Sequence, residues 1–335
     1  MKQVGRELGV RYVLEGSVRK GGNRVRITAQ LIDAETGAHL WADRFDGSLD
    51  DVFELQDQIA TSVAGVIEPA LQAAEIRRSA DRPTSDLTAY DLYLRALSHY
   101  EGGRVGVEQA LELLGRAIER DPGYGAALAL AAHCHQTLDI IGLTKDPAAN
   151  RSAGVDLARK ALRVARDDPD VLGRAAFVFG YFCEDIDAAI ALIDRALELN
   201  PSFALGWFRS GWLRLWLGQP DLAIEHFQSS LRLSPRDPIA SSFLGIGVGH
   251  FFARRFEEAR AMLLRSLQES PNSVSTYRYL AACCAQMGRL DEARQVVEGL
   301  RALTPLVVWS ASQFRNSEHR KLHLQGLRMA AGEAT

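Results

Sequence analysis

Histidines and cysteines are the residues of this sequence that could hold a metal ion. His319 and His323 lie four residues apart and could chelate one ion from one helical face, but the sequence offers no third ligand nearby. His133 and His135 lie about 200° apart around a helix, so they cannot share an ion. No C-x-x-C pair occurs among the cysteines, which are Cys134, Cys183, Cys283 and Cys284. We therefore expect reduced, buried thiols, a solvated terminal helix around the histidine pair, and no metal site.

Two other stretches contain residue types that can form a ligand-binding or catalytic site. The glycine-rich GIGVG (245–249) is a candidate phosphate loop, but it follows no predicted strand and lies inside a predicted helix, where glycines permit close helix packing. Asp185 and Asp187 fall in a short turn between helices, where acidic residues are ordinary. No nucleophile is paired with a base. The sequence therefore predicts no enzyme and no cofactor.

Composition excludes several classes of partner. The chain has 335 residues, a net charge of -3 and a pI near 6.3, which argues against direct nucleic-acid binding. No stretch approaches the roughly 20 apolar residues that span a bilayer. Glu7 interrupts the place where a signal peptide needs its apolar run. We therefore expect a cytoplasmic protein with no membrane partner.

The elements that position these residues follow a repeat. Prolines preceded by Asp, Asn, Ser or Thr recur at 122, 169, 201, 235, 271 and 305, with successive spacings of 47, 32, 34, 36 and 34. Twelve residues before each proline stands a mostly small residue: Ala110, Leu157, Ala189, Ala223, Ala259 and Ala293. Eight residues before it stands a mostly larger apolar one: Leu114, Ala161, Ile193, Phe227, Leu263 and Val297. The i, i+4 spacing places both columns on one helix face, and the proline ends each helix.

This pattern resembles the tetratricopeptide repeat, a 34-residue helix-turn-helix unit. The best match runs from Ala204 to Pro235, with Trp207, Gly211, Ala223 and Phe227 in the family's positions. We expect about six units between residues 86 and 305, the first beginning near Ala89. The second is stretched around residues 139–151, where we expect an exposed loop. Residues 306–335 are expected to form a capping helix and tail.

Three tryptophans in WFRSGWLRLW (207–216) cannot all face the same way. Trp207 lies about 40° from Gly211, on the face that packs inside its repeat. Trp212 and Trp216 lie on the other face, which in such solenoids tends to line the concave groove. They are either covered by a neighbouring helix or open to a ligand. The same register predicts a groove for a partly apolar peptide or a partner helix, lined by Tyr90, Tyr93, Tyr100, His133, Gln136, Phe208, Arg209, Trp212, Trp216 and Arg278.

Residues 1–80 do not carry the repeat. Residues 10–20 and 24–34 alternate apolar and polar side chains, and Gly21-Gly22-Asn23 between them suits a hairpin turn. A second turn at Glu35-Thr36-Gly37 leads to a third strand at 38–47, and a helix follows from about Val52 to Arg78. The predicted order is a helix, a three-stranded meander and a long helix.

The stretches ELGVRYVLEGSV, RVRITAQLIDAETGAHLWADRFD and DVFELQDQIA resemble the TolB amino-terminal-like module. That module accompanies tetratricopeptide repeats in bacterial proteins, often behind a class III adenylate cyclase domain or a winged-helix domain. The resemblance implies a sensory or interaction region without catalytic residues. Such modules normally begin with a strand, a helix and a second strand that are not found here. We therefore expect an unpaired strand edge, and interpret the chain as a fragment, the alternative being that a partner supplies the missing strand.

The sequence thus predicts a mainly α protein, a tetratricopeptide-repeat solenoid preceded by a small, incomplete α/β module. Its expected function is non-catalytic: it binds a protein or peptide partner in the concave groove, with self-association through the N-terminal strand edge as a further expectation. The alternative is that it forms the C-terminal regulatory portion of a class III adenylate cyclase or a winged-helix transcriptional regulator.

Overall fold

The computed structural model describes residues 2–80, 88–100, 103–142, 144–182, 185–234 and 241–333. These residues form two compact units, 1–98 and 99–335, which are described separately. The predicted domain boundary at 81–86, and the predictions for Cys183 and Pro235, fall outside the described residues.

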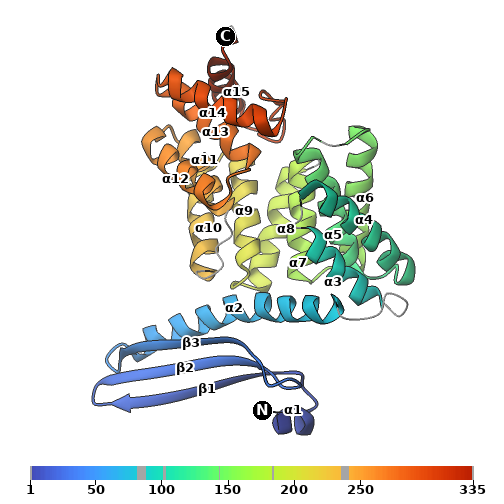
Figure 1. Ribbon diagram of the computed structural model, residues 1–335, viewed down its shortest axis with the longest axis vertical. Helices are drawn as coiled ribbons and strands as arrows, with labels where there is room; N and C mark the ends of the chain where they lie inside the picture. Colours follow the sequence, from blue (N-terminus) through green and yellow to red (C-terminus); the bar gives the residue numbers. More distant parts are fainter. Residues whose placement is uncertain are drawn as a thin grey trace. The chain divides into compact units, whose positions relative to one another are not determined.

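A three-stranded antiparallel sheet is the centre of the N-terminal unit (Figure 1). Its strands are β1 (Tyr12–Gly21), β2 (Arg24–Asp33) and β3 (His39–Ser48), in the order β1-β2-β3. The short helix α1 (Lys2–Leu8) precedes the sheet, and α2 (Val52–Ala80) and α3 (Ala89–Tyr100) follow it. The predicted meander between two helices is therefore confirmed.

The turns and the core of this unit follow from its sequence. Gly22 has a φ of 61° in the two-residue turn between β1 and β2, a conformation that glycine adopts without steric cost. Apolar residues of β2 and β3 form a core with α2, comprising Ala29, Leu31 and Trp41 with Val63, Val66, Ala70 and Leu71. At the same sheet face, Glu75 of α2 accepts hydrogen bonds from Arg11 and from the Tyr12 hydroxyl.

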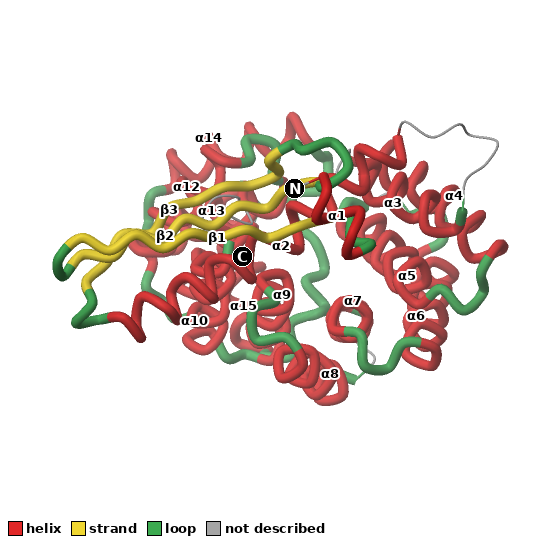
Figure 2. Tube along the Cα trace, turned by 90° about the horizontal axis from the view of Figure 1, so that it is seen from below, coloured by secondary structure: helices red, strands yellow, loops and turns green. Residues whose placement is uncertain are grey.

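The C-terminal unit consists of helices packed in successive pairs, several of which Figure 2 shows nearly end-on. The helices after α3 are α4 (Gly103–Arg120), α5 (Gly125–Ile140), α6 (Pro147–Val164), α7 (Pro169–Tyr181), α8 (Ile186–Leu199), α9 (Ala204–Leu217), α10 (Pro220–Leu233), α11 (Ser241–Phe252), α12 (Phe256–Glu269), α13 (Val274–Gln286), α14 (Leu290–Leu303) and α15 (Ser317–Ala331). The pairs are α5–α6, α7–α8, α9–α10, α11–α12 and α13–α14, and α15 packs on α13 and α14.

The two residue columns of the repeat form the core of this unit, as predicted. Ala189, Ala223, Ala259 and Ala293 are fully buried, and so are Ile193, Phe227 and Leu263. A Cβ atom at Gly245 would overlap the Phe227 ring, and one at Gly247 would come within 2.8 Å of the Leu263 side chain. The glycines of GIGVG therefore serve close packing of α11 against α10 and α12, which confirms the packing interpretation of that stretch.

Side-chain caps determine where several helices begin. Asp168, Asp185, Ser273 and Asn316 each accept a hydrogen bond from a backbone N–H in the first turn of the helix that follows. Asp146 does the same for α6, whose first residue is Pro147. The exposed loop expected at 139–151 is shorter than predicted: the described residues 141, 142 and 144–146 lie outside helices and are mostly exposed, but α5 continues to Ile140 and α6 begins at Pro147, because this cap and the proline start a helix inside the insertion.

Candidate binding pocket

A ladder of aromatic rings connects the first helices of successive pairs. The Tyr100 ring contacts His133 of α5 with centroids 5.4 Å apart, and His133 contacts Phe177 of α7 at 5.7 Å. Phe177 in turn stacks on Trp216 of α9 at 5.0 Å. Because each ring covers the next, this face of α5, α7 and α9 is joined by packing rather than left open.

A buried charge cluster accompanies the ladder. Asp170 at the start of α7 accepts hydrogen bonds from Arg174 at 2.7 Å and from Arg209 of α9 at 2.9 Å. Burial alone raises the pKa of the Asp170 carboxyl, but the two guanidinium groups outweigh it and hold that pKa below its usual range. Burial, together with these guanidinium groups, also lowers the pKa of His133 well below its usual value. The ion pair between Asp170 and Arg209 therefore joins α7 to α9, with Asp170 ionised and His133 neutral.

The segment between α14 and α15, residues 304–316, is the longest described stretch of this unit without a helix, and we call it the crossing segment. It contacts three of the first helices in turn. Arg278 of α13 donates to the carbonyl oxygens of Leu306 and Val307, the Phe314 ring packs on Phe252 of α11, and the Arg315 N–H donates to the Trp216 carbonyl of α9. Parts of α9, α11 and α13 are thus covered by the crossing segment.

Trp309 fixes the middle of the crossing segment. Its ring lies 5.3 Å from the Arg278 guanidinium carbon, and its indole N–H donates to Nε2 of His323 at 3.0 Å. His323 belongs to α15, is fully buried and stacks on Tyr279 of α13 with ring centroids 4.2 Å apart. The expectation of a solvated terminal helix is therefore wrong, because α15 buries His323 and its apolar face against α13.

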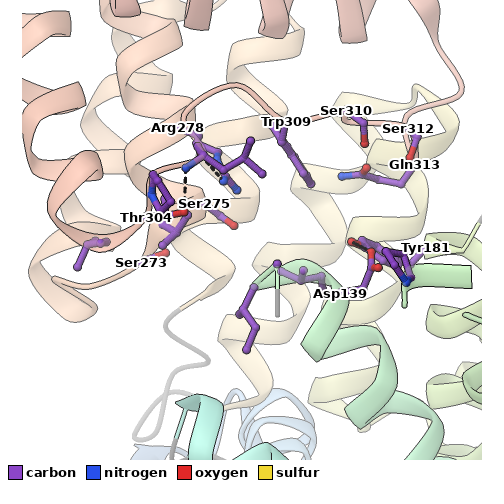
Figure 3. Close-up of a pocket in the computed structure, with 18 of the residues that line it drawn as sticks. Asp139, Tyr181, Ser273, Ser275, Arg278, Thr304, Trp309, Ser310, Ser312 and Gln313 are labelled. Carbon is purple, nitrogen blue, oxygen red and sulfur yellow. Dashed lines mark hydrogen bonds between the residues drawn. The ribbon is translucent and has the colours of Figure 1, made fainter. Parts of the chain in front are cut away.

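A pocket of about 1060 Å³ lies between the crossing segment and the ends of α5 and α7. Figure 3 shows Arg278, Ser273, Ser275 and Thr304 gathered on one side, Trp309, Ser310, Ser312 and Gln313 beside them, and Asp139 and Tyr181 across the pocket. The Tyr181 hydroxyl donates to Asp139 at 2.9 Å.

The pocket also has apolar walls. Three residues that line it, Ile141, Leu303 and Leu306, are apolar and 41%, 39% and 50% exposed. The pocket therefore combines exposed apolar surface with a row of hydroxyl groups.

The predicted groove residues divide between accessible and buried positions. In the N-terminal unit, Tyr90 is exposed and Tyr93 is buried. In the C-terminal unit, Tyr100, His133, Phe208 and Trp212 are half-buried, whereas Gln136, Arg209, Trp216 and Arg278 are buried. Arg278 is the predicted residue that also lines the pocket. A partner-binding role for these residues stays a prediction.

The sequence predicts that Trp216 is either covered by a neighbouring helix or open to a ligand, and the structure shows that a neighbouring helix covers it. Its ring lies between Phe177 and Tyr181, both from α7. Arg209 is likewise not open to a groove, because Asp170 binds it in the interior. Trp207 packs inside its repeat, as expected, with its ring edge-to-face on His226 of α10. It is only half-buried, however, and its indole N–H donates to the Pro201 carbonyl.

The described residues contain no group of three or more His, Cys, Asp or Glu side chains able to hold a metal ion. Burial raises the pKa of Cys134 and Cys283 to about 12 and that of Cys284 to about 11, so these thiols are protonated at neutral pH. Over the same described ranges, no helix has both the length and the apolar character needed to cross a membrane.

Sequence reasoning missed most of the pocket. Ile141, Leu306, Trp309 and Gln313 lie in connections between helices, outside the periodic columns that identified the repeat. One signal could have drawn attention to them. The interval from the last repeat proline, Pro305, to the start of α15 at Ser317 is longer than the two to eight residues usual between packed helices, and its sequence contains an aromatic residue, Trp309.

Comparison with known proteins identifies the repeat. The tetratricopeptide repeat family matches residues 184–238 and 253–310. The helical pairs within these two ranges are tetratricopeptide repeats. The fold is similar to the crystal structure of the APC/C hetero-tetramer Cut9-Hcn1, with a TM-score of 0.54, 15% identity, and coverage of 83% of this chain and 49% of that one. It is also similar to the structure of the human IFIT1 dimer with m7Gppp-AAAA, with a TM-score of 0.57, 16% identity, and coverage of 66% and 51%. At these identities the similarity concerns the fold alone.

Two curated proteins are similar in sequence. One, named "Putative adenylate cyclase 3" of Rhizobium meliloti (strain 1021), is 40% identical over 174 residues, which are 52% of this chain and 28% of that protein. The other, Superkiller complex protein 3 of Mus musculus, is 25% identical over 170 residues, which are 50% of this chain and 11% of that protein. The chain thus matches only a minor part of the length of either relative.

Proposed function

We propose that this chain is a non-catalytic scaffold that binds an extended, partly apolar peptide segment of a protein partner in the pocket beside the crossing segment. The observation that carries the proposal is the exposure of Ile141 and Leu306 on walls that also present hydroxyl groups. Exposed apolar side chains gathered at a concave site typically mark a binding surface. Hydroxyl groups beside them can bond the backbone of an extended peptide.

The described part of the pocket favours a peptide over a reacting substrate. Tyr181 and Asp139 are bonded to each other, and Arg278 is bonded to backbone carbonyls. The described lining residues include no cysteine and no histidine, the commonest nucleophile and base of such sites. We expect the purified chain to show no cyclase turnover with ATP or GTP and magnesium or manganese. Turnover that survives repurification and disappears with a defined point mutation would contradict the non-catalytic part of the proposal.

The experiment that tests peptide binding is selection from a random peptide library, followed by titration of the enriched peptides. Ile141→Ser and Leu306→Ser should weaken their binding by about tenfold each, because apolar contact area is lost. Val164→Ser is the matched control, since Val164 is as exposed as Leu306 but does not line the pocket. If all three variants bind the enriched peptides equally well, the pocket is not the peptide site, and the half-buried Phe208 and Trp212 become the next candidates.

A second candidate function places the chain in signal transduction, as the regulatory portion of a class III adenylate cyclase or a winged-helix regulator. The 40% identity to the Rhizobium protein supports the cyclase version. The resemblance of residues 1–80 to the TolB amino-terminal-like module belongs to the same proposal. The two functions are compatible, because a peptide-binding solenoid can regulate a domain to which it is joined. Co-expression with a separate cyclase domain tests this candidate: an unchanged cyclase rate would contradict it.

A further inference from the structure

Arg278 is a buried cation for which the described part of the chain provides no anionic partner. The residue is 4% exposed, and its side-chain hydrogen bonds are made to the neutral carbonyl groups of Leu306 and Val307. Burial lowers the pKa of its guanidinium from the usual value, and no described carboxylate opposes that effect. A buried charge is costly unless a countercharge compensates it.

Other arginines in this unit show the usual arrangement. Arg209 is buried against Asp170, Arg214 donates to Asp194 at 2.7 Å, and Arg260 is paired with Glu292. Each of these guanidinium groups has a carboxylate within hydrogen-bond distance. Arg278 instead has two carbonyl dipoles and the face of the Trp309 ring, which offset part of the desolvation cost but carry no full negative charge.

The surroundings of Arg278 also suit an anion. The first turn of α13 lines the same pocket through Ser273, Val274 and Ser275. Ser273 caps the Thr276 N–H. The N–H groups of Val274 and Ser275 also belong to the first turn and have no acceptor within the helix. The positive end of the helix dipole therefore adds to the charge of Arg278. Figure 3 shows Ser273, Ser275 and Thr304 beside Arg278, on the side of the pocket away from Asp139.

We infer that the peptide segment bound in this pocket carries an acidic side chain that pairs with Arg278. This inference rests on the proposed peptide-binding function and specifies its chemistry. One buried guanidinium matches the single charge of an Asp or Glu carboxylate, with Ser275 and Thr304 hydroxyls as neighbouring donors. The apolar walls formed by Ile141, Leu303 and Leu306 suit the flanking residues of the same segment.

The test compares two pools of labelled, end-blocked nonapeptides with apolar residues around a central Asp or a central Asn. The two residues have nearly the same shape, so the comparison isolates the charge. We expect the wild-type chain to bind the Asp pool at least about tenfold more tightly. Raising the salt concentration should reduce this preference, because it screens the ion pair. A third pool with central phosphoserine, and a fourth with Asn and a free C-terminus, distinguish the alternative sources of negative charge.

Two variants assign the effect to Arg278. Arg278→Gln keeps a donor for the Leu306 carbonyl but removes the charge, so the Asp preference should disappear. Arg278→Lys keeps the charge and should retain part of it. If a thermal melt shows that Arg278→Gln is unfolded, the pools on the wild type with and without salt still test the acidic preference, and Arg278→Lys tests its assignment to Arg278.

Different outcomes separate this inference from the proposed function. Equal binding of the Asp and Asn pools would overturn the acidic specificity and leave peptide binding intact, as would preference for phosphoserine or for the free C-terminus. An Asp preference that persists in folded Arg278→Gln would overturn the assignment to Arg278. If no pool binds better than a hydrophilic control peptide, both the inference and the proposed function fail.

Discussion

The two tryptophans on opposite faces of α9 differ in what they stabilise. Trp216 is buried between Phe177 and Tyr181, whereas Trp207 is half-buried against His226. We expect Trp216→Ala to lower the free energy of unfolding by about 3–5 kcal/mol, as large core truncations do. Trp207→Ala, the matched control, should cost about 1 kcal/mol, a typical value for point mutations. Urea unfolding of both variants measures the two losses of stability. Equal losses would contradict the expectation that the buried ring contributes more than the half-buried one.

Buried neutral histidines make the stability of the chain depend on pH. Burial, and then Arg278, lower the pKa of His323 to about 3, while an unfolded chain restores the usual value near 6.5. The unfolded state therefore binds the proton more readily, and stability should fall as the pH decreases from about 6.5 towards 3. This one group should contribute up to about 1.4 kcal/mol per pH unit in that window. His226, whose pKa is lowered to about 4, acts in the same direction.

Replacing His323 tests that assignment. His323→Gln keeps an acceptor for the Trp309 N–H and removes the titrating group, so stability should fall less steeply below pH 6.5 than in the wild type. Above pH 7 the two proteins should show the same pH dependence. Parallel curves throughout the acidic range, measured by chemical unfolding, would contradict a neutral buried His323.

At the scale of elements, the helical pairs could be predicted from the sequence because a small residue and a larger apolar residue recur four positions apart in successive repeats. Ala223 and Phe227, or Ala259 and Leu263, have to face a neighbouring helix wherever the repeat occurs. The pocket could not be predicted in the same way. It depends on the path of the crossing segment, which includes Ala311 at a φ of 51°, and no periodic pattern specifies that path.

The close approach of α10 and α11 gives a prediction at the same scale. A methyl group at Gly245 would overlap the buried Phe227 ring, so Gly245→Ala should destabilise the chain by about 1–3 kcal/mol. Gly115 of α4 is the control, because a Cβ there would meet nothing within 4 Å. Gly115→Ala should stabilise by about 0.5–1 kcal/mol through helix propensity. Thermal melts that move in the same direction for both variants would contradict the packing described here.

At the scale of the whole molecule, the edge of the N-terminal sheet bears on self-association. Strand β1 pairs with β2 on one side, and no described strand pairs with its other side. Leu14 and Val18 on this strand are 48% and 68% exposed, on the sheet face that carries Leu31 and Trp41. Natural proteins usually protect such an edge with charges, with prolines or by covering it. An antiparallel pair of two β1 strands centred on Gly16 would place Leu14 of one copy opposite Val18 of the other.

We therefore expect the chain to form a concentration-dependent dimer through β1. Val18→Lys should shift the equilibrium to the monomer. The dimer would then carry one lysine from each copy close to its two-fold axis, and both Leu14–Val18 contacts would be lost. Val105→Lys is the matched control, since Val105 is 62% exposed on α4 and should leave the dimer unchanged. Sedimentation velocity over a concentration series measures both variants. If the wild type remains a monomer throughout, or if both lysine variants weaken the dimer equally, the open edge of β1 is not the contact between copies.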